Sequence, residues 1–143
     1  MIRRCTSCGR QNRIPAARLS DAGRCGGCRQ PIGPVREPLD VTGAEHDEIV
    51  GSTRVPVLID FWAEWCGPCK AAAPEVARAA ADMSGRALVL KVDTEREPDL
   101  AARYGVRSIP SFVVLKDGTV VTRHVGVVAH DRLEGWLEQA ARS

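Results

Sequence analysis

No stretch of this 143-residue sequence approaches the length of about 20 apolar residues that a membrane-spanning helix needs. The first residues, MIRRCTSCGRQNR, are basic but lead into no apolar segment, so no secretory signal can be recognised. We therefore expect a cytoplasmic protein that does not enter the membrane. In that reducing compartment, cysteines serve as metal ligands or redox groups more often than as structural disulfides.

The first 37 residues also lack aromatic side chains and have few large apolar ones. They show no sustained period of 2 or 3.6 residues, so this segment cannot fold by burying apolar surface alone. Its charge is uneven too, because eight arginines stand against Asp21 and Glu37, a net charge of +6. The remaining residues carry a net charge of −4.

The six cysteines form three Cys-x-x-Cys pairs. Sixteen residues separate the pair Cys5/Cys8 from the pair Cys25/Cys28, a spacing typical of a four-cysteine zinc site. Two thiolates on one tight turn occupy adjacent corners of a tetrahedron, and a second such turn completes it. Zinc binding supplies roughly 10–16 kcal/mol, enough to fold a segment without a core. We predict one structural Zn²⁺ per chain on these four residues. Two redox pairs or a disulfide staple form the alternative.

From about Leu39 onward, strand-like and helix-like segments alternate, which predicts an α/β domain. We expect strands at 55–62 and 87–93, helices at 71–83 and 97–105, two strands around Asp117-Gly118 at 111–126, and an amphipathic helix at 130–141. The proline-rich joint IGPVREP, at 32–38, marks a boundary. We therefore divide the chain into a four-cysteine zinc-binding module with its linker at 1–37 and a domain at 38–143, whose core looks complete by itself.

The third pair, Cys66/Cys69, has no second pair left with which to complete a metal site. It lies where an apolar strand gives way to a helical segment. A thiol attacks a disulfide only as the thiolate, and the unpaired N–H groups at a helix start favour the thiolate of Cys66. A stabilised thiolate is also the better leaving group, and Cys69, one turn further, is the natural resolving thiol.

These residues resemble thioredoxin. The resemblance rests on FWAEWCGPCK (61–70), SIPSF (108–112), KDG (116–118) and HVG (124–126), in the family's order. The cysteine-rich front end resembles the second, zinc-ribbon type of bacterial thioredoxin. The resemblance implies a thioredoxin fold, which is a central mixed β-sheet flanked by helices, with a small N-terminal zinc-ribbon-like module. It also implies a protein-disulfide reductase that contributes to electron transport and cell redox homeostasis.

The resemblance also implies partner proteins. An NADPH-dependent flavoprotein, thioredoxin reductase, would recycle the chain, and disulfide-containing proteins would be its clients. We expect a monomer that carries no organic cofactor of its own.

The same resemblance assigns roles to single residues. Asp60 matches the family's buried acid, which helps to deprotonate the resolving cysteine, and burial should raise its pKa; an exposed strand edge is the alternative position. Lys91 matches the lysine near that acid, although a solvated lysine fits the sequence nearly as well. The dipeptide Ile109-Pro110 matches the family's cis-proline loop. The substrate-binding rim would consist of Trp65, Gly67, Pro68, Ile109, Pro110, Val125 and Gly126.

Two other functions stay open. One is a thiol oxidase or isomerase, although the Gly-Pro dipeptide between the third pair of cysteines resembles reducing members of the family. The other is a nucleic-acid- or protein-binding zinc module on a thioredoxin scaffold. Its basic charge favours the binding of nucleic acid, but the lack of aromatic rings removes stacking platforms and argues against it. We expect Trp62 in the core, and His46, His124 and His130 at the surface or in loops.

Overall fold

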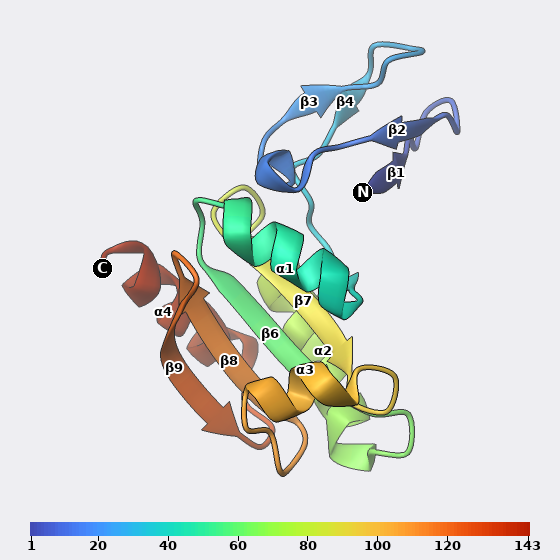
Figure 1. The fold of residues 1–143 in the computed structure, drawn as a ribbon. Coiled ribbons are helices and arrows are strands. Elements are labelled where there is room, and N and C mark those ends of the chain that lie inside the picture. Colours follow the sequence, from blue (N-terminus) through green and yellow to red (C-terminus); the bar gives the residue numbers. More distant parts are fainter.

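The computed structural model describes all residues from Met1 to Ser143. Two short hairpins form a small N-terminal module, which lies above a larger α/β part in Figure 1. Its elements are β1 (Ile2–Arg4), β2 (Gln11–Arg13), the 3-10 helix η1 (Ala16–Arg18), β3 (Gly23–Arg24) and β4 (Pro31–Ile32). Within each hairpin the strands are antiparallel.

The larger part contains a five-stranded sheet in the order β5-β7-β6-β8-β9. Its strands are β5 (Leu39–Asp40), β6 (Val57–Trp62), β7 (Leu88–Asp93), β8 (Ser111–Lys116) and β9 (Thr119–Val125). Strand β7 runs parallel to β5 and β6, whereas β8 is antiparallel to β6 and β9. The predicted mixed α/β sheet is therefore confirmed.

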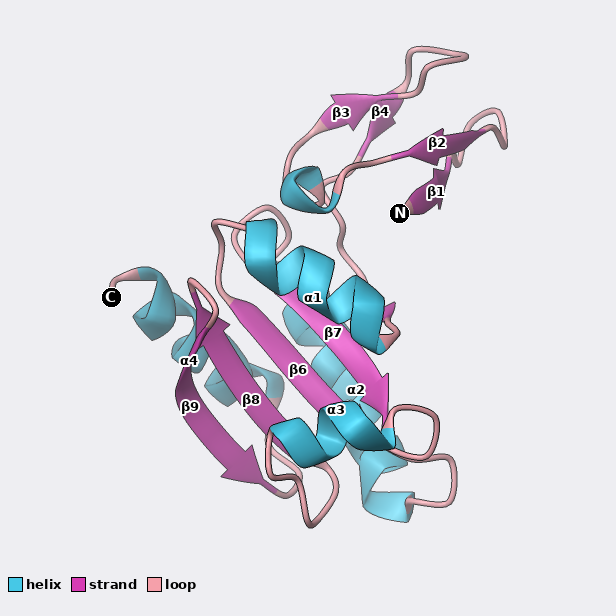
Figure 2. Cartoon of the chain, in the orientation of Figure 1, coloured by secondary structure: helices cyan, strands magenta, loops and turns pink.

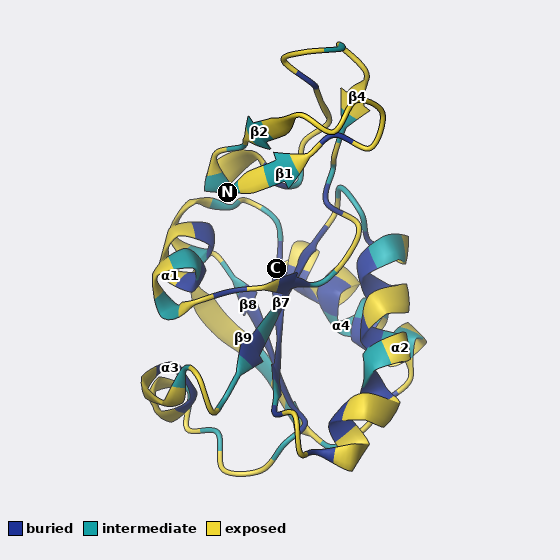
Figure 3. Ribbon diagram, turned by 90° about the vertical axis from the view of Figure 1, so that its right-hand side faces the viewer, coloured by how far each residue is buried: buried dark blue, intermediate teal, exposed yellow.

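Helices cover both faces of this sheet. They are α1 (Gly43–Ser52), α2 (Gly67–Asp82), α3 (Pro98–Arg103) and α4 (His130–Ala141). Figure 2 shows α1 and α3 in front of the sheet and α2 and α4 behind it. In Figure 3, the buried residues follow the strands and the inward sides of the helices. None of the helices has the length and apolarity that a membrane crossing requires.

Local sequence explains where several elements begin and end. Thr42 and Glu45 form a capping box that starts α1, because each side chain accepts the backbone N–H of the other residue. Asp117 and Gly118 make the tight turn between β8 and β9. Such a turn requires positive φ at both residues, and their φ values are 51° and 77°.

The N-terminal module packs onto the larger part through Leu19 and Val35. These side chains are only 1% and 4% exposed, and both belong to the core cluster on the α1 side of the sheet, together with Leu39 and Ile49. Val35 N–H donates to the carbonyl oxygen of Leu19 (3.0 Å). The expectation of a complete core from Leu39 onward is therefore wrong, because the module and the joint supply part of it.

The module and the start of α2 lie at opposite ends of the sheet (Figure 1). The module contacts the end at which β6 and β7 begin, where Ser84 Oγ, in the loop before β7, donates to the carbonyl oxygen of Pro34 (3.5 Å). Cys66 lies past the opposite end of β6, at the start of α2. The module therefore contacts the end of the sheet that lies away from Cys66.

Candidate active site and metal centre

Cys66 and Cys69 are joined by a disulfide, with Cα atoms 5.3 Å apart. Cys66 is the N-cap residue of α2, and its Sγ accepts the backbone N–H of Cys69 (3.1 Å). Pro68 fits in the first turn of the helix because an N–H at that position would have no helical partner. Cys66 is 3% exposed and Cys69 is 5% exposed. The pair thus begins a helix whose N–H groups stabilise negative charge on Cys66 once the disulfide is reduced.

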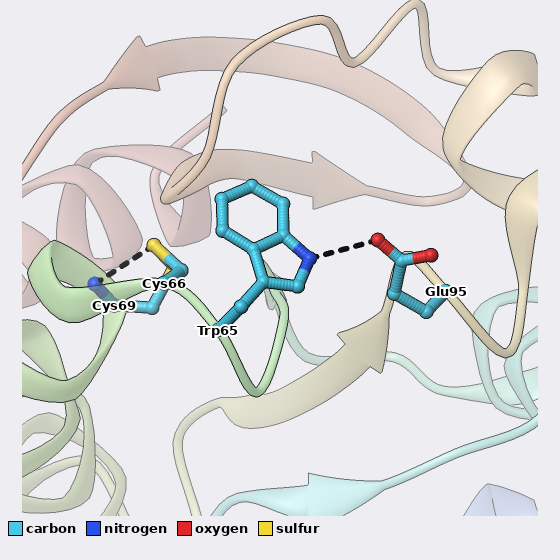
Figure 4. The surroundings of a disulfide bond; sticks show 4 residues. All are labelled: Trp65, Cys66, Cys69 and Glu95. Atoms are coloured by element: carbon cyan, nitrogen blue, oxygen red, sulfur yellow. Dashed lines mark hydrogen bonds between the residues drawn. A yellow bond between two sulfur atoms is a disulfide. The ribbon is translucent and has the colours of Figure 1, made fainter.

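An exposed tryptophan stands beside this disulfide. Trp65 is 70% exposed, and its indole Nε1–H donates to Glu95 Oε1 (2.8 Å), as Figure 4 shows. Glu95 lies in the loop after β7, and no motif in the sequence marked it as part of the site. Its carboxylate orients the exposed indole next to the cysteines.

The predicted proline loop packs against the cysteines. The Ile109–Pro110 peptide bond is cis, and Ile109 packs against the cluster formed by Ala63 and the two cysteines. The Pro110 carbonyl oxygen accepts the N–H of Gly126 (2.9 Å), next to Val125, which is 61% exposed. Gly67 and Pro68 are exposed. The structure therefore brings these predicted rim residues to one end of the sheet.

Asp60 is a buried acid on the central strand β6. It is 2% exposed, and its Oδ1 has no hydrogen-bond partner. Burial raises the pKa of Asp60 to about 7, Lys91 acts against this shift, and Asp40 adds to it. Lys91 is the β7 neighbour of both acids in the sheet. An edge position for Asp60 is excluded, and its side chain can exchange a proton near neutral pH.

Trp62 is only half-buried, contrary to the expectation that it belongs to the core. Its ring centroid lies 4.5 Å from Lys91 Nζ, so the lysine stacks on the indole. Both residues line a groove of about 610 Å³. The groove also contains six carboxylates, those of Asp40, Glu45, Glu64, Asp93, Glu95 and Glu97. Lys91 is therefore neither free in solvent nor buried in the core.

The other four cysteines meet at the tips of the two N-terminal hairpins. Their Sγ atoms all lie within 4.8 Å of one another, and the contacts Cys5–Cys28 and Cys8–Cys25 are both 3.6 Å. Four sulfurs bound to zinc at about 2.3 Å in a tetrahedron are separated by about 3.8 Å. The sulfur positions therefore fit a tetrahedral zinc ion.

The two cysteine turns have the same backbone hydrogen bonds. Gly9 N–H donates to the Cys5 carbonyl oxygen (2.9 Å), and Arg29 N–H donates to that of Cys25 (3.1 Å). The residues after the second cysteine of each pair, Gly9 and Arg29, have φ of 79° and 66°. This left-handed conformation favours glycine, so Arg29 is the strained member of the two turns.

Backbone dipoles already favour thiolates at this centre. The N–H groups of Cys8 and Ser7 lower the pKa of Cys5, and those of Cys28 and Gly27 lower the pKa of Cys25 to about 6. The Gln30 N–H lowers the pKa of Cys28, but burial and the neighbouring sulfurs outweigh it and raise that pKa to about 11. Four simultaneous thiolates therefore need a bound cation.

The expectation of surface or loop histidines is wrong for His46, which is 2% exposed within α1. Its Nε2 lies 2.6 Å from Tyr104 Oη and its Nδ1 lies 2.9 Å from Asp47 Oδ1. His124 lies in β9, with its ring centroid 5.2 Å from that of Trp136. His130 begins α4, where its N–H and Nδ1 both contact Glu75.

Comparison with known proteins agrees with this geometry. Residues 37–139 match the thioredoxin family, and residues 4–30 match the N-terminal family of thioredoxin 2. Thioredoxin C-3 of Corynebacterium nephridii is 40% identical over 139 residues, which cover 97% of this chain and 94% of that protein. Thioredoxin 1 of Synechococcus elongatus is 42% identical over 99 residues, or 69% of this chain and 92% of that protein.

A solved structure supports the same assignment. A point mutant of thioredoxin from Halobacterium salinarum NRC-1 superposes with a TM-score of 0.69 and 37% identity. The match covers 74% of this chain and 92% of the other. The chain therefore belongs to the thioredoxin family of thiol–disulfide oxidoreductases, which act as protein-disulfide reductases, and it carries the N-terminal segment of thioredoxin 2.

Proposed function

We propose that this chain reduces disulfide bonds of client proteins by using Cys66 as the nucleophile and Cys69 as the resolving thiol. The observation that carries the proposal is the position of the Cys66–Cys69 disulfide at the start of α2. There, Cys66 Sγ already accepts a backbone N–H, which stabilises a thiolate at that sulfur.

The reaction transfers two electrons from the dithiol to the client. The Cys66 thiolate attacks one sulfur of the client disulfide, forms a mixed disulfide and displaces the other client sulfur as a thiolate, which takes up a proton. Cys69 then loses its proton and attacks Cys66 Sγ, which releases the second client thiolate and leaves the Cys66–Cys69 disulfide.

Asp60 is the group that we propose as proton acceptor for Cys69. A carboxyl group with a pKa near 7 is present in both protonation states at neutral pH, so it can take up a proton and give it back. Lys91, the strand neighbour of Asp60, acts as a positioning residue that limits the rise of this pKa.

The exposed rim receives an extended client segment. Trp65 and Val125 offer apolar surface, since both are largely exposed in a protein that buries most of its large apolar side chains. The exposed Gly67 and Pro68 and the half-buried Ile109 and Gly126 complete this surface, whereas Pro110 is buried beneath it. Apolar anchors of this kind supply binding energy without a need for a defined client sequence.

The N-terminal module, which we place at residues 1–37, would hold one structural zinc ion. Cys5, Cys8, Cys25 and Cys28 supply four sulfurs at distances that fit a tetrahedron, so no position is open for a reactive water. The zinc would fold a module that has little core of its own, and the module in turn contributes Leu19 to the domain at 38–143.

Recycling by an NADPH-dependent thioredoxin reductase and a location in the cytoplasm complete the proposal. Both rest on membership of the thioredoxin family. In a reducing compartment, the zinc thiolates would stay reduced between catalytic cycles.

A coupled assay tests this function. NADPH consumption is measured with a thioredoxin reductase and a disulfide-containing model protein, and wild type is compared with Cys66→Ser and with Cys8→Ser. We expect Cys66→Ser to abolish the reaction, whereas Cys8→Ser removes an exposed sulfur at the far end of the sheet and leaves most of the activity. An active Cys66→Ser protein beside an inactive Cys8→Ser protein would reverse the roles of the two sites.

A further inference from the structure

One side chain connects the two hairpins of the N-terminal module independently of any metal. Asn12 lies on β2, in the first hairpin, and its Oδ1 accepts the N–H of Gly26 in the second hairpin (2.9 Å). Its Nδ2 donates to Cys25 Sγ (3.6 Å) and to the Arg10 carbonyl oxygen (3.1 Å). Apart from the contacts between cysteine sulfurs, the bonds of Asn12 to Gly26 and to Cys25 are the side-chain hydrogen bonds that join the two hairpins.

The residues on either side of Asn12 point away from this contact. Asn12 is half-buried, whereas Gln11 and Arg13 are exposed, as the alternation of side chains along a strand requires. The carboxamide is therefore directed at the second cysteine turn by the register of β2 with β1. It reaches the turn at both a backbone N–H and a sulfur.

Cys25 is consequently the sulfur with the most donors around it. It is fully buried, and its Sγ accepts the N–H of Gly27 (3.3 Å) in addition to the Asn12 amide. Hydrogen bonds to a metal-bound thiolate remove part of its negative charge and hold its direction. Four thiolates around one Zn²⁺ leave a net charge of −2, so each donor reduces the repulsion between the sulfurs.

We propose that Asn12 is a positioning residue of the zinc centre, which holds Cys25 and the second hairpin in place for the metal. This inference rests on the proposed zinc site and concerns the retention of the metal rather than disulfide reduction. Groups that orient metal ligands typically contribute a factor of about 10–100 to metal affinity. We expect Asn12→Ala to weaken zinc binding by about that factor.

The experiment uses the full chain with Cys66 and Cys69 oxidised, so that only the four N-terminal thiols bind metal. Zinc affinity is measured by competition with a chelator for wild type, Asn12→Ala, Asn12→Asp and the matched control Gln11→Ala. The aspartate variant keeps an oxygen that accepts the Gly26 N–H but loses the donor to Cys25 Sγ. The measurements are made at high ionic strength, which screens its added charge.

Substitution of zinc by cobalt supplies a second measurement. The thiolate-to-cobalt charge-transfer band reports on the sulfurs bound to the metal, and its energy does not depend on how much of the protein is loaded. We expect the band to move to lower energy in Asn12→Ala and Asn12→Asp, since the loss of a donor raises the electron density on Cys25 Sγ. The Gln11→Ala protein should match wild type in both affinity and spectrum.

Equal zinc affinity and an unchanged cobalt band in all four proteins would overturn the role of Asn12 and leave the zinc centre standing. An Asn12→Asp protein identical to wild type would overturn the part that rests on the Cys25 contact. A wild-type protein that binds neither metal would overturn the zinc centre and this inference with it.

Discussion

The stability of an Asp60→Asn protein minus that of wild type should rise as the pH increases from acid to alkaline values. Asp60 is buried on the central strand with one oxygen that has no partner, and its pKa is raised to about 7. In the unfolded chain, an aspartate has a pKa of about 3.9. The folded state therefore holds a proton that the unfolded state releases above about pH 4.

The sign and size of the effect follow from these two pKa values. The stabilisation from the protonated Asp60 is fully present below about pH 4 and is lost as the pH rises to about 7. A difference of about three pKa units corresponds to about 4 kcal/mol. Between pH 5 and pH 8, the stability of Asp60→Asn minus that of wild type should increase by about 2.6 kcal/mol. The cost of burying the amide adds a constant that cancels across pH.

Chemical denaturation of the oxidised proteins measures this difference at a fixed zinc concentration. Asp99→Asn is the matched control for the exchange of an aspartate for an asparagine, because Asp99 is exposed. A stability difference for Asp60→Asn that stayed constant from pH 5 to pH 8 would refute the elevated pKa. Asp60 would then have a pKa well below neutral and would be too weak a base to take up the proton of Cys69 in the way we describe.

Three further predictions concern the N-terminal module. Leu19→Ala should lower the free energy of unfolding of the whole chain by about 2–5 kcal/mol, because it opens a cavity in the shared core. The control Arg18→Ala changes an exposed neighbour and should alter this free energy little, which denaturant unfolding of both variants checks. Arg29→Gly should stabilise the zinc-loaded protein by about 1–2 kcal/mol, since Arg29 has a φ of 66°, and an equal or lower stability would contradict the strain. Removal of zinc by a chelator should lower the melting temperature of the larger domain as well, which calorimetry detects, and an unchanged transition would show that Leu19 contributes nothing to its core.

The grouping of the six cysteines could be predicted from the sequence because spacing alone separates them. Two pairs sixteen residues apart bring four sulfurs together, and the third pair remains at a strand-to-helix junction. Strands β6 and β7 could also be predicted from the sequence, since each is a short apolar run. Helix α2 begins at Gly67, earlier than the predicted residue 71. Glycine and proline are poor helix formers in a helix interior and so argued for a later start, but both fit the first turn.

Helix α1 was missed although its start was readable. Thr42 and Glu45 have the spacing of a capping box, but the helix has only a weak apolar stripe. Without that helix, no face could be assigned to His46, and its burial against Tyr104 stayed hidden. A capping box gives the position of a helix start even where periodicity is weak.

Contacts between segments far apart in the chain could not be predicted from the sequence. Leu19 and Val35 are isolated apolar residues in a polar segment, and no local period marks them as core. The contacts of Asn12 with Gly26 and of Glu95 with Trp65 join residues 14 and 30 positions apart. Such pairs depend on how the hairpins and loops approach one another, which no local pattern encodes.

Native mass spectrometry of the Cys69→Ser protein can decide whether one cysteine pair reacts while the other two hold a metal. After incubation with a disulfide-linked client peptide, we expect one zinc ion per chain and one peptide attached through Cys66, because the resolving thiol is absent. The Cys66→Ser protein should retain the zinc ion and form no adduct. A peptide attached to Cys5, Cys8, Cys25 or Cys28, or an adduct that forms only with loss of zinc, would overturn this division of roles.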